Sequence, residues 1–305
     1  MRVAHLTRIS VGRNVLQTSR LQAFKWRSNK QRHIASRRFS CAKPAILCLY
    51  SEFQVAEQGM EALEYLSSGS AILLPQRTDS DTWQLLTCQH IVCPWRFPRY
   101  FSEKWDWLQF VQPPHVQYRV VLMDPHAKIL YEAQLDPKVC LHPLRDVAML
   151  SISDDIACLS LTKALETNSM GPVDFDPEML EIGAKVKIYG HEADESSDFV
   201  PRCVSGHFAG QNGHKQAFAW TQQAVREGMC GGAVLDQKCR AIGVIEGIVP
   251  KHTDGDESSS IDQNLAEHVA MIPSDVIQFF IQKHQTSERE LEAVITGTAL
   301  ASNCQ

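Results

Sequence analysis

Short apolar runs separated by turn residues dominate the chain from about residue 70 onward. Runs of this length, rich in Val, Ile, Leu and aromatic residues, are typical of β-strands. No long helical pattern intervenes, so the spacing indicates a β-sandwich or a barrel. The predicted strands are 71–74, 83–86, 118–123, 128–132, 147–152, 185–189, 202–206, 217–220, 232–235 and 241–248.

A helical period is visible only near the two ends of this region. In residues 54–67, apolar side chains recur at helical intervals and Ser68-Gly69-Ser70 follows as a breaker, which predicts a short helix. A second helix is predicted over 275–284, with Ser274 after Pro273 as its N-cap. Residues 93–114 and 251–264 read as long loops between strands.

Charge divides the chain at about residue 40. Residues 1–40 hold ten Lys or Arg and no Asp or Glu, which is the composition of an organelle transit peptide. Arg37-Arg38-Phe39-Ser40 resembles a mitochondrial processing site, so a mitochondrial location is predicted, with a plastid as the second choice. A disordered basic tail or a nucleic-acid-binding arm is the alternative interpretation of the segment.

The rest of the chain carries 20 basic and 35 acidic residues, which argues against a nucleic-acid partner. No apolar stretch approaches the roughly 18 to 20 residues that span a membrane. The ten cysteines form no C-x-x-C pair and match no zinc-ligand spacing, so neither a metal nor another cofactor is expected.

The segment Gly228-Met229-Cys230-Gly231-Gly232 carries the strongest chemical signal. Its glycines permit a sharp turn and close approach of a substrate backbone, and a buried strand is predicted directly after it. Cys230 would then be a nucleophile presented on the turn. The amides of Gly228 and Cys230 could donate to a developing oxyanion.

Two further segments supply partners for this thiol. The strand at 83–86 ends in Thr87-x-x-His90, which places an imidazole at the end of a strand, where it can act as a general base. Asp146 directly precedes the alternating strand at 147–152, where a half-buried carboxylate can orient the imidazole. Taken singly, a surface histidine and a turn aspartate are the ordinary readings of these residues.

In the order His90, Asp146, Cys230, the chain resembles the trypsin-like peptidases, and among them the HtrA/Deg protease domain. The segments 181–186, Cys203-Val204-Ser205-Gly206 and 270–277 are also similar to this family. The resemblance covers about residues 68–283 and implies two six-stranded antiparallel β-barrels with the site in the cleft between them. Cys230 and Met229 depart from the family pattern, which has serine and Asn or Asp there.

The expected organisation is a transit peptide at 1–40, an N-terminal extension with a helix at 41–67, the peptidase domain at 68–283 and a tail at 284–305. The resemblance implies an endopeptidase acting on polypeptides through a thioacyl intermediate, and it leaves a homo-oligomer possible. It also implies that Ala224 and Val225 line the primary specificity pocket, with small or medium apolar side chains preferred. An inactive homologue that binds peptides or acts as a scaffold is the alternative, and redox sensing by Cys230 is a third.

Overall fold

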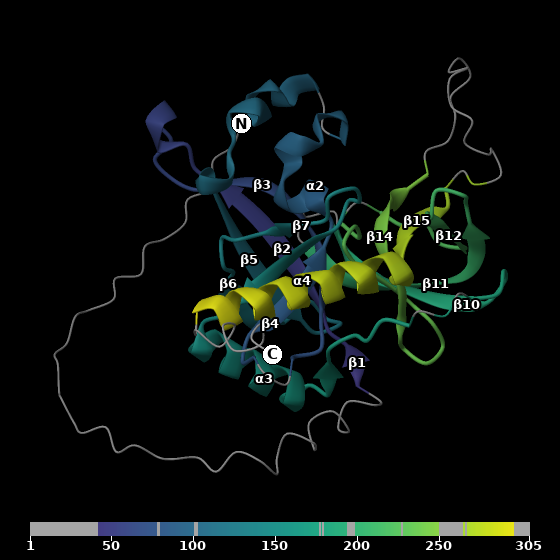
Figure 1. Ribbon diagram of the computed structural model, residues 1–305. Coiled ribbons are helices and arrows are strands. Elements are labelled where there is room, and N and C mark those ends of the chain that lie inside the picture. The colour runs from purple at the N-terminus through teal and green to yellow at the C-terminus, as the bar shows by residue number, and fades with distance from the viewer. Residues whose placement is uncertain are drawn as a thin grey trace, which may run out of the picture.

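The computed structural model describes residues 42–295, apart from 78–79, 101–102, 177, 179, 194–198, 227, 250–264 and 266 (Figure 1). The predicted transit peptide, the predicted loop at 251–264 and the last ten residues lie outside the described residues. Two large β-sheets organise the described chain, and helices flank them.

The first sheet has seven strands in the order β6-β5-β2-β3-β4-β8-β7, and all neighbours in it are antiparallel. Its strands are β2 (Ile46–Phe53), β3 (Glu64–Leu73), β4 (Trp83–Thr87), β5 (Val116–Met123), β6 (Ile129–Gln134), β7 (Cys140–Leu141) and β8 (Ala148–Ile152). A separate parallel pair joins β1 (Lys43–Pro44) to β9 (Met170–Gly171).

The second sheet is a closed six-stranded barrel in the order β10-β11-β12-β15-β14-β13. Its strands are β10 (Lys185–Ala193), β11 (Phe199–Gln211), β12 (Ala217–Thr221), β13 (Ala233–Leu235), β14 (Ala241–Ile248) and β15 (Val269–Pro273). Along β10, exposed Lys185 and Lys187 alternate with buried Val186 and Ile188, the period of two that a strand with one buried face requires.

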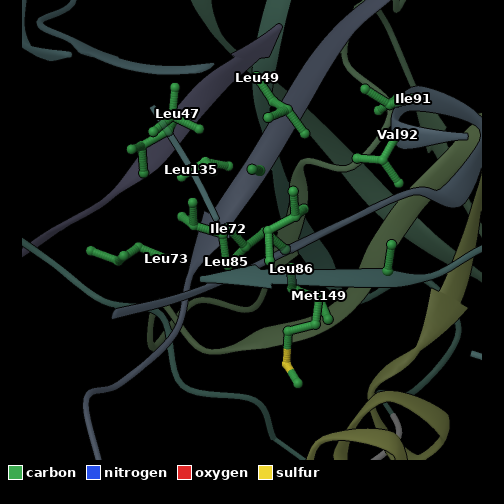
Figure 2. Close-up of a cluster of buried hydrophobic side chains, with 14 of the residues drawn as sticks. Leu47, Leu49, Ile72, Leu73, Leu85, Leu86, Ile91, Val92, Leu135 and Met149 are labelled. Carbon is green, nitrogen blue, oxygen red and sulfur yellow. The ribbon is translucent and has the colours of Figure 1, made fainter. Parts of the chain in front are cut away.

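The core of the seven-stranded sheet is built from fully buried aliphatic side chains. Figure 2 shows Leu47 and Leu49 of β2 beside Ile72 of β3 and Leu86 of β4. Ile91, which follows β4, packs into the same cluster and is 1% exposed. The polypeptide just after β4 is therefore held by the core of the sheet.

Two helices are long, α3 (Asp155–Thr167) and α4 (Ser274–Ile295). The others are short: the single turn α2 (Gln89–Val92) and the 3-10 helices at Ala56–Gln58, Pro94–Arg96, Pro98–Tyr100, Glu103–Phe110 and Pro113–His115. Figure 1 shows α4 leading from the barrel across the seven-stranded sheet, and its Ile277 and Phe280 belong to that sheet's core. In the described part of the chain, no helix is both long and apolar enough to span a membrane.

The helix predicted at residues 54–67 is wrong. Within this range the chain forms a 3-10 turn at Ala56–Gln58 and the start of β3 instead. The first residues of β3, from Glu64 to Ser67, pair with β2, and that pairing uses the backbone hydrogen bonds a helix would need. Moreover, Leu63 is exposed while Val55 and Leu66 are buried, so the helical spacing does not mark one buried face. The predicted domain start at residue 68 falls inside β3.

Of the two predicted barrels, the structure shows one as a closed six-stranded barrel, while the other sheet has seven strands and open edges at β6 and β7. Helix α3 was not predicted, although Cys158, Leu161 and Leu165 give it a buried stripe and Asp154 caps Ala157 N–H at 2.8 Å. The C-terminal helix was predicted, but it continues to Ile295 rather than ending at residue 284.

Candidate active site

His90 lies in the single helical turn α2, which begins where β4 ends. Ile91 and Val92 anchor this turn in the core of the seven-stranded sheet (Figure 2). The Tyr118 hydroxyl donates to the Val92 carbonyl at 2.8 Å, and Ser51 donates to the Ile91 carbonyl at 2.7 Å. Because both backbone and side chains on either side are fixed, the imidazole of His90 has a defined position.

Asp146 is hydrogen-bonded to His90 through both of its carboxylate oxygens. Its Oδ2 lies 2.5 Å from His90 Nδ1, and its Oδ1 accepts the His90 backbone N–H at 2.9 Å. The Asp146 side chain is 4% exposed and that of His90 is 14% exposed. This geometry fixes the ring plane and places a proton on Nδ1, so that Nε2 is the nitrogen left to exchange a proton.

Gln89 holds the loop that carries Asp146. Its Nε2 lies 2.5, 2.9 and 3.0 Å from the carbonyl oxygens of His142, Arg145 and Val147. The residue is 2% exposed, so these carbonyls give its buried amide group the hydrogen-bond partners that water cannot supply. Two neighbours in sequence, Gln89 and His90, thus bind the same loop.

The turn that carries Cys230 requires its glycines. Gly228 and Gly231 have φ of +94° and +80°. A Cβ atom on Gly231 would overlap the Ser70 carbonyl oxygen, and one on Gly228 would lie 2.8 Å from the His191 carbonyl oxygen. The predicted sharp turn with positive φ is confirmed at these two residues, while close approach of a substrate backbone stays a prediction.

Ser70 of β3 ties this turn to the seven-stranded sheet. Its backbone N–H donates to the Cys230 carbonyl at 2.8 Å, and its hydroxyl donates to the Gly228 carbonyl at 3.0 Å. The same hydroxyl oxygen accepts the His191 N–H at 2.8 Å. Cys230 is a barrel residue, yet its turn is anchored to the sheet from which His90 projects.

Cys230 lies next to His90, close enough to influence the pKa of the ring, and its thiol is half-buried. Burial acts to lower the pKa of His90, but the interactions with Asp146 and Cys230 outweigh it and raise that pKa from 6.5 to about 10. Both partners therefore favour the protonated ring. The structure brings the three predicted side chains together, with Asp146 hydrogen-bonded to His90; their catalytic roles stay predictions.

The predicted oxyanion donors are the amides of Gly228 and Cys230. The Met229 carbonyl accepts the Gly232 N–H at 3.0 Å, and since a trans peptide directs N–H opposite to C=O, the Cys230 N–H points away from that bond. Within the described part of the chain, neither amide has a backbone acceptor. Their role as oxyanion donors stays a prediction.

Ala224 and Val225 precede this turn. Ala224 is exposed, while Val225 is half-buried and packs against the core of the barrel. Their assignment to a specificity pocket stays a prediction.

Sequence reasoning missed several residues around the site. The Tyr100 ring meets the His90 ring edge-on at 5.1 Å between centroids. Glu246 of β14 has a pKa raised by burial and by the nearby Asp146 carboxylate, and it accepts from Gln216 Nε2 at 2.7 Å. Only their position in the folded chain identifies them, since no local pattern marks either residue.

Cys88, His90 and Asp146 have potential metal-ligand atoms within 4.8 Å of one another. Two of those atoms, His90 Nδ1 and Asp146 Oδ2, are already 2.5 Å apart in a hydrogen bond, closer than two ligands of one tetrahedral zinc ion can lie. Cys88 Sγ donates to the Ile245 carbonyl at 3.1 Å. This arrangement suits proton transfer better than metal binding.

No protein-family model matches the chain, and no curated protein matches it. Among solved structures, the chain is similar to a serine endoprotease from Yersinia pestis, with 14% sequence identity and a TM-score of 0.46. The alignment covers 84% of this chain and 66% of that one.

Proposed function

We propose that this protein is an endopeptidase in which Cys230 is the nucleophile, His90 the general base and acid, and Asp146 the residue that orients His90. The observation that carries the proposal is the hydrogen bond between Asp146 and His90, with the Cys230 thiol next to the same imidazole. A nucleophile beside a base that is itself held by a third group is the arrangement that covalent catalysis needs.

The reaction begins when Cys230 gives its proton to His90 and its sulfur attacks the carbonyl carbon of a peptide bond. The negative charge that develops on the oxygen faces the amides of Cys230 and Gly228, and each such donor contributes about 3 to 4 kcal/mol to the transition state. His90 then protonates the leaving amine, for which its raised pKa suits it. Water, deprotonated by His90, hydrolyses the thioester.

Asp146 favours both halves of this cycle. Its carboxylate stabilises the protonated ring, and its hydrogen bond to Nδ1 keeps Nε2 directed at the sulfur. Gln89 and Ser70 are positioning residues. Gln89 fixes the loop that carries Asp146, and Ser70 fixes the turn that carries Cys230. The barrel and the seven-stranded sheet each supply part of the site, as in an enzyme whose substrate lies between two sheets.

The test is cleavage of a reduced and alkylated polypeptide that cannot fold, with products identified by mass spectrometry. We expect the wild-type chain to cut it and Cys230→Ala and His90→Ala to lose activity by about a thousandfold or more. Cys203→Ala is the matched control, because Cys203 is an exposed thiol on β11 outside the site, and it should cut at the wild-type rate.

Equal product formation by wild type and Cys230→Ala would refute the nucleophile. Absence of any cleavage, together with binding of the unfolded polypeptide by wild type, would identify the inactive peptide-binding homologue instead. Circular dichroism of each variant separates loss of chemistry from loss of fold.

A further inference from the structure

A second thiol lies beside the site, and the proposed mechanism does not use it. Cys88 connects β4 to α2 and is fully buried. Its Sγ donates to the Ile245 carbonyl of β14 at 3.1 Å. An alanine in place of Cys88 would fill most of this buried space, whereas the cysteine places a second reactive sulfur next to Cys230.

Three contacts place Cys88 next to the Cys230 turn. The Ile245 carbonyl that accepts from Cys88 also accepts the N–H of Gly231, the residue after Cys230, at 2.9 Å. A Cβ atom on Gly231 would lie 2.5 Å from Thr87 Oγ1, so the side chain of the residue before Cys88 packs against the residue after Cys230. A disulfide forms without large movement only between cysteines whose backbones are close, and these contacts bring the two segments together.

His90 provides a second, independent link between the two sulfurs. Cys88 Sγ lies within 4.8 Å of the His90 and Asp146 ligand atoms, and the Cys230 thiol lies next to His90, whose pKa it helps to raise. The two thiols therefore border the same imidazole from different segments of the chain.

The two thiols differ in how far they are buried, and burial decides which of them an oxidant reaches first. Cys230 is half-buried, so a small peroxide can reach it, whereas Cys88 is 0% exposed. Burial raises the pKa of Cys88 well above its usual value, and the charges of Asp146 and Cys230 raise it further. Cys88 thus stays a protonated, shielded thiol, and oxidation begins at Cys230.

We propose that Cys88 and Cys230 form a disulfide when a hydroperoxide oxidises the site. In the first step the Cys230 sulfur attacks the peroxide, the O–O bond breaks, and Cys230 becomes a sulfenic acid while the peroxide is reduced to water or an alcohol. In the second step the Cys88 sulfur attacks the Cys230 sulfur, the S–O bond breaks, and the hydroxyl leaves as water with the Cys88 proton.

This reaction would make the site a reversible switch. The disulfide removes the nucleophile, and a dithiol reductant restores both thiols. It would also prevent further oxidation of Cys230 to the sulfinic acid, which thiols do not reverse. The inference goes beyond the proposed peptidase activity and does not depend on it, since the disulfide can form in a chain that cleaves nothing.

The experiment treats the full chain with hydrogen peroxide, blocks remaining thiols and maps cysteine peptides by mass spectrometry without reduction. We expect the free thiol count to fall by two and a crosslinked pair of peptides to contain Cys88 and Cys230. Dithiothreitol should return both thiols. Where a peptidase assay is available, activity should fall and return with the crosslink.

Cys88→Ser and Cys158→Ser are the matched variants. Cys158 is also buried, and its Sγ also donates to a backbone carbonyl, that of Ile152, at 3.1 Å. Serine can keep either hydrogen bond, so both variants should fold. We expect Cys88→Ser to accumulate sulfinic acid at Cys230 under peroxide, and Cys158→Ser to crosslink as wild type does.

Three results would overturn the proposal. The first is Cys230 sulfinic acid in wild type while Cys88 remains free. The second is a Cys230 crosslink to a different cysteine, and the third is equal over-oxidation in wild type and Cys88→Ser. If the wild-type chain cleaves polypeptides but forms no Cys88–Cys230 crosslink, this inference is refuted and the proposed function is not.

Discussion

The proton on His90 offers a direct physical test of the site. Burial alone acts to lower the pKa of His90, and the influences that raise it to about 10 come from Asp146 and Cys230. The difference between 6.5 and about 10 corresponds to about 5 kcal/mol in favour of the protonated ring. Because the His90 side chain is only 14% exposed, solvent screens this stabilisation little.

The perturbation is the double variant Asp146→Asn/Cys230→Ser, which removes both groups that raise the pKa of His90 and leaves burial as the main influence. We expect the pKa of His90 to fall from about 10 to below 6.5. Each single variant should give an intermediate value. These changes keep side-chain size close to the original, so the fold should persist.

The assay is a pH titration followed by NMR of the isotopically labelled histidine rings. The His90 signal is assigned as the one that disappears in His90→Gln. His191 is an internal reference at the opposite extreme, since burial lowers its pKa to about 3. A wild-type His90 that titrates near 6.5, or a double variant that titrates as wild type does, would refute the electrostatic description of the site.

Three further changes test the surroundings of the site. Gln89→Leu removes the donor to the Asp146 loop and should lower the free energy of unfolding by about 2 to 3 kcal/mol in a urea titration. An unchanged urea midpoint would contradict the role of Gln89 in holding that loop. His191 stays neutral when folded, so the unfolded chain takes up a proton between about pH 6.5 and 3 that the folded chain does not, and stability falls as the pH falls through that window. His191→Leu should therefore flatten the acid limb of melting temperature against pH, and a wild-type slope would count against a buried, uncharged ring. Gly231→Ala should lower the free energy of unfolding by more than about 3 kcal/mol in a thermal melt, because its Cβ would meet the Ser70 backbone. Gly213→Ala is the control and should not lower it so far, because no atom lies within 4 Å of a Cβ there. Similar losses of stability in both variants would show that the contact with Ser70 is not the cause.

The strands were predictable because alternation and turn residues are local signals. Each predicted strand overlaps one in the structure, although β11 and β3 extend well beyond the predicted ranges. Strand β2 was missed because the sequence before residue 54 carries no alternation, and its identity as a strand comes from pairing with β3 and β5 on both sides. Pairing of β3 with β2 likewise replaces the apparent helix over residues 64–67, the last part of the range 54–67.

The candidate site was predictable only where a residue sits in its own local motif. His90, Asp146 and Cys230 each end or begin an apolar run, so their types and order stand out. Ser70, Gln89 and Cys88 act on residues 53 to 158 positions away in the chain, and no local pattern encodes such contacts. Closure of only one sheet is likewise a property of long-range pairing.

The central claim is that Cys230 forms a covalent bond to its substrate, and rapid acid quenching followed by intact-protein mass spectrometry measures this bond directly. A peptide thioester or activated ester supplied in excess should leave an acyl group on wild-type protein, mapped to Cys230 and absent from Cys230→Ala. Hydroxylamine should release it, as expected for a thioester. An unmodified Cys230 under turnover conditions, or an acyl group that persists in Cys230→Ala, would contradict the account.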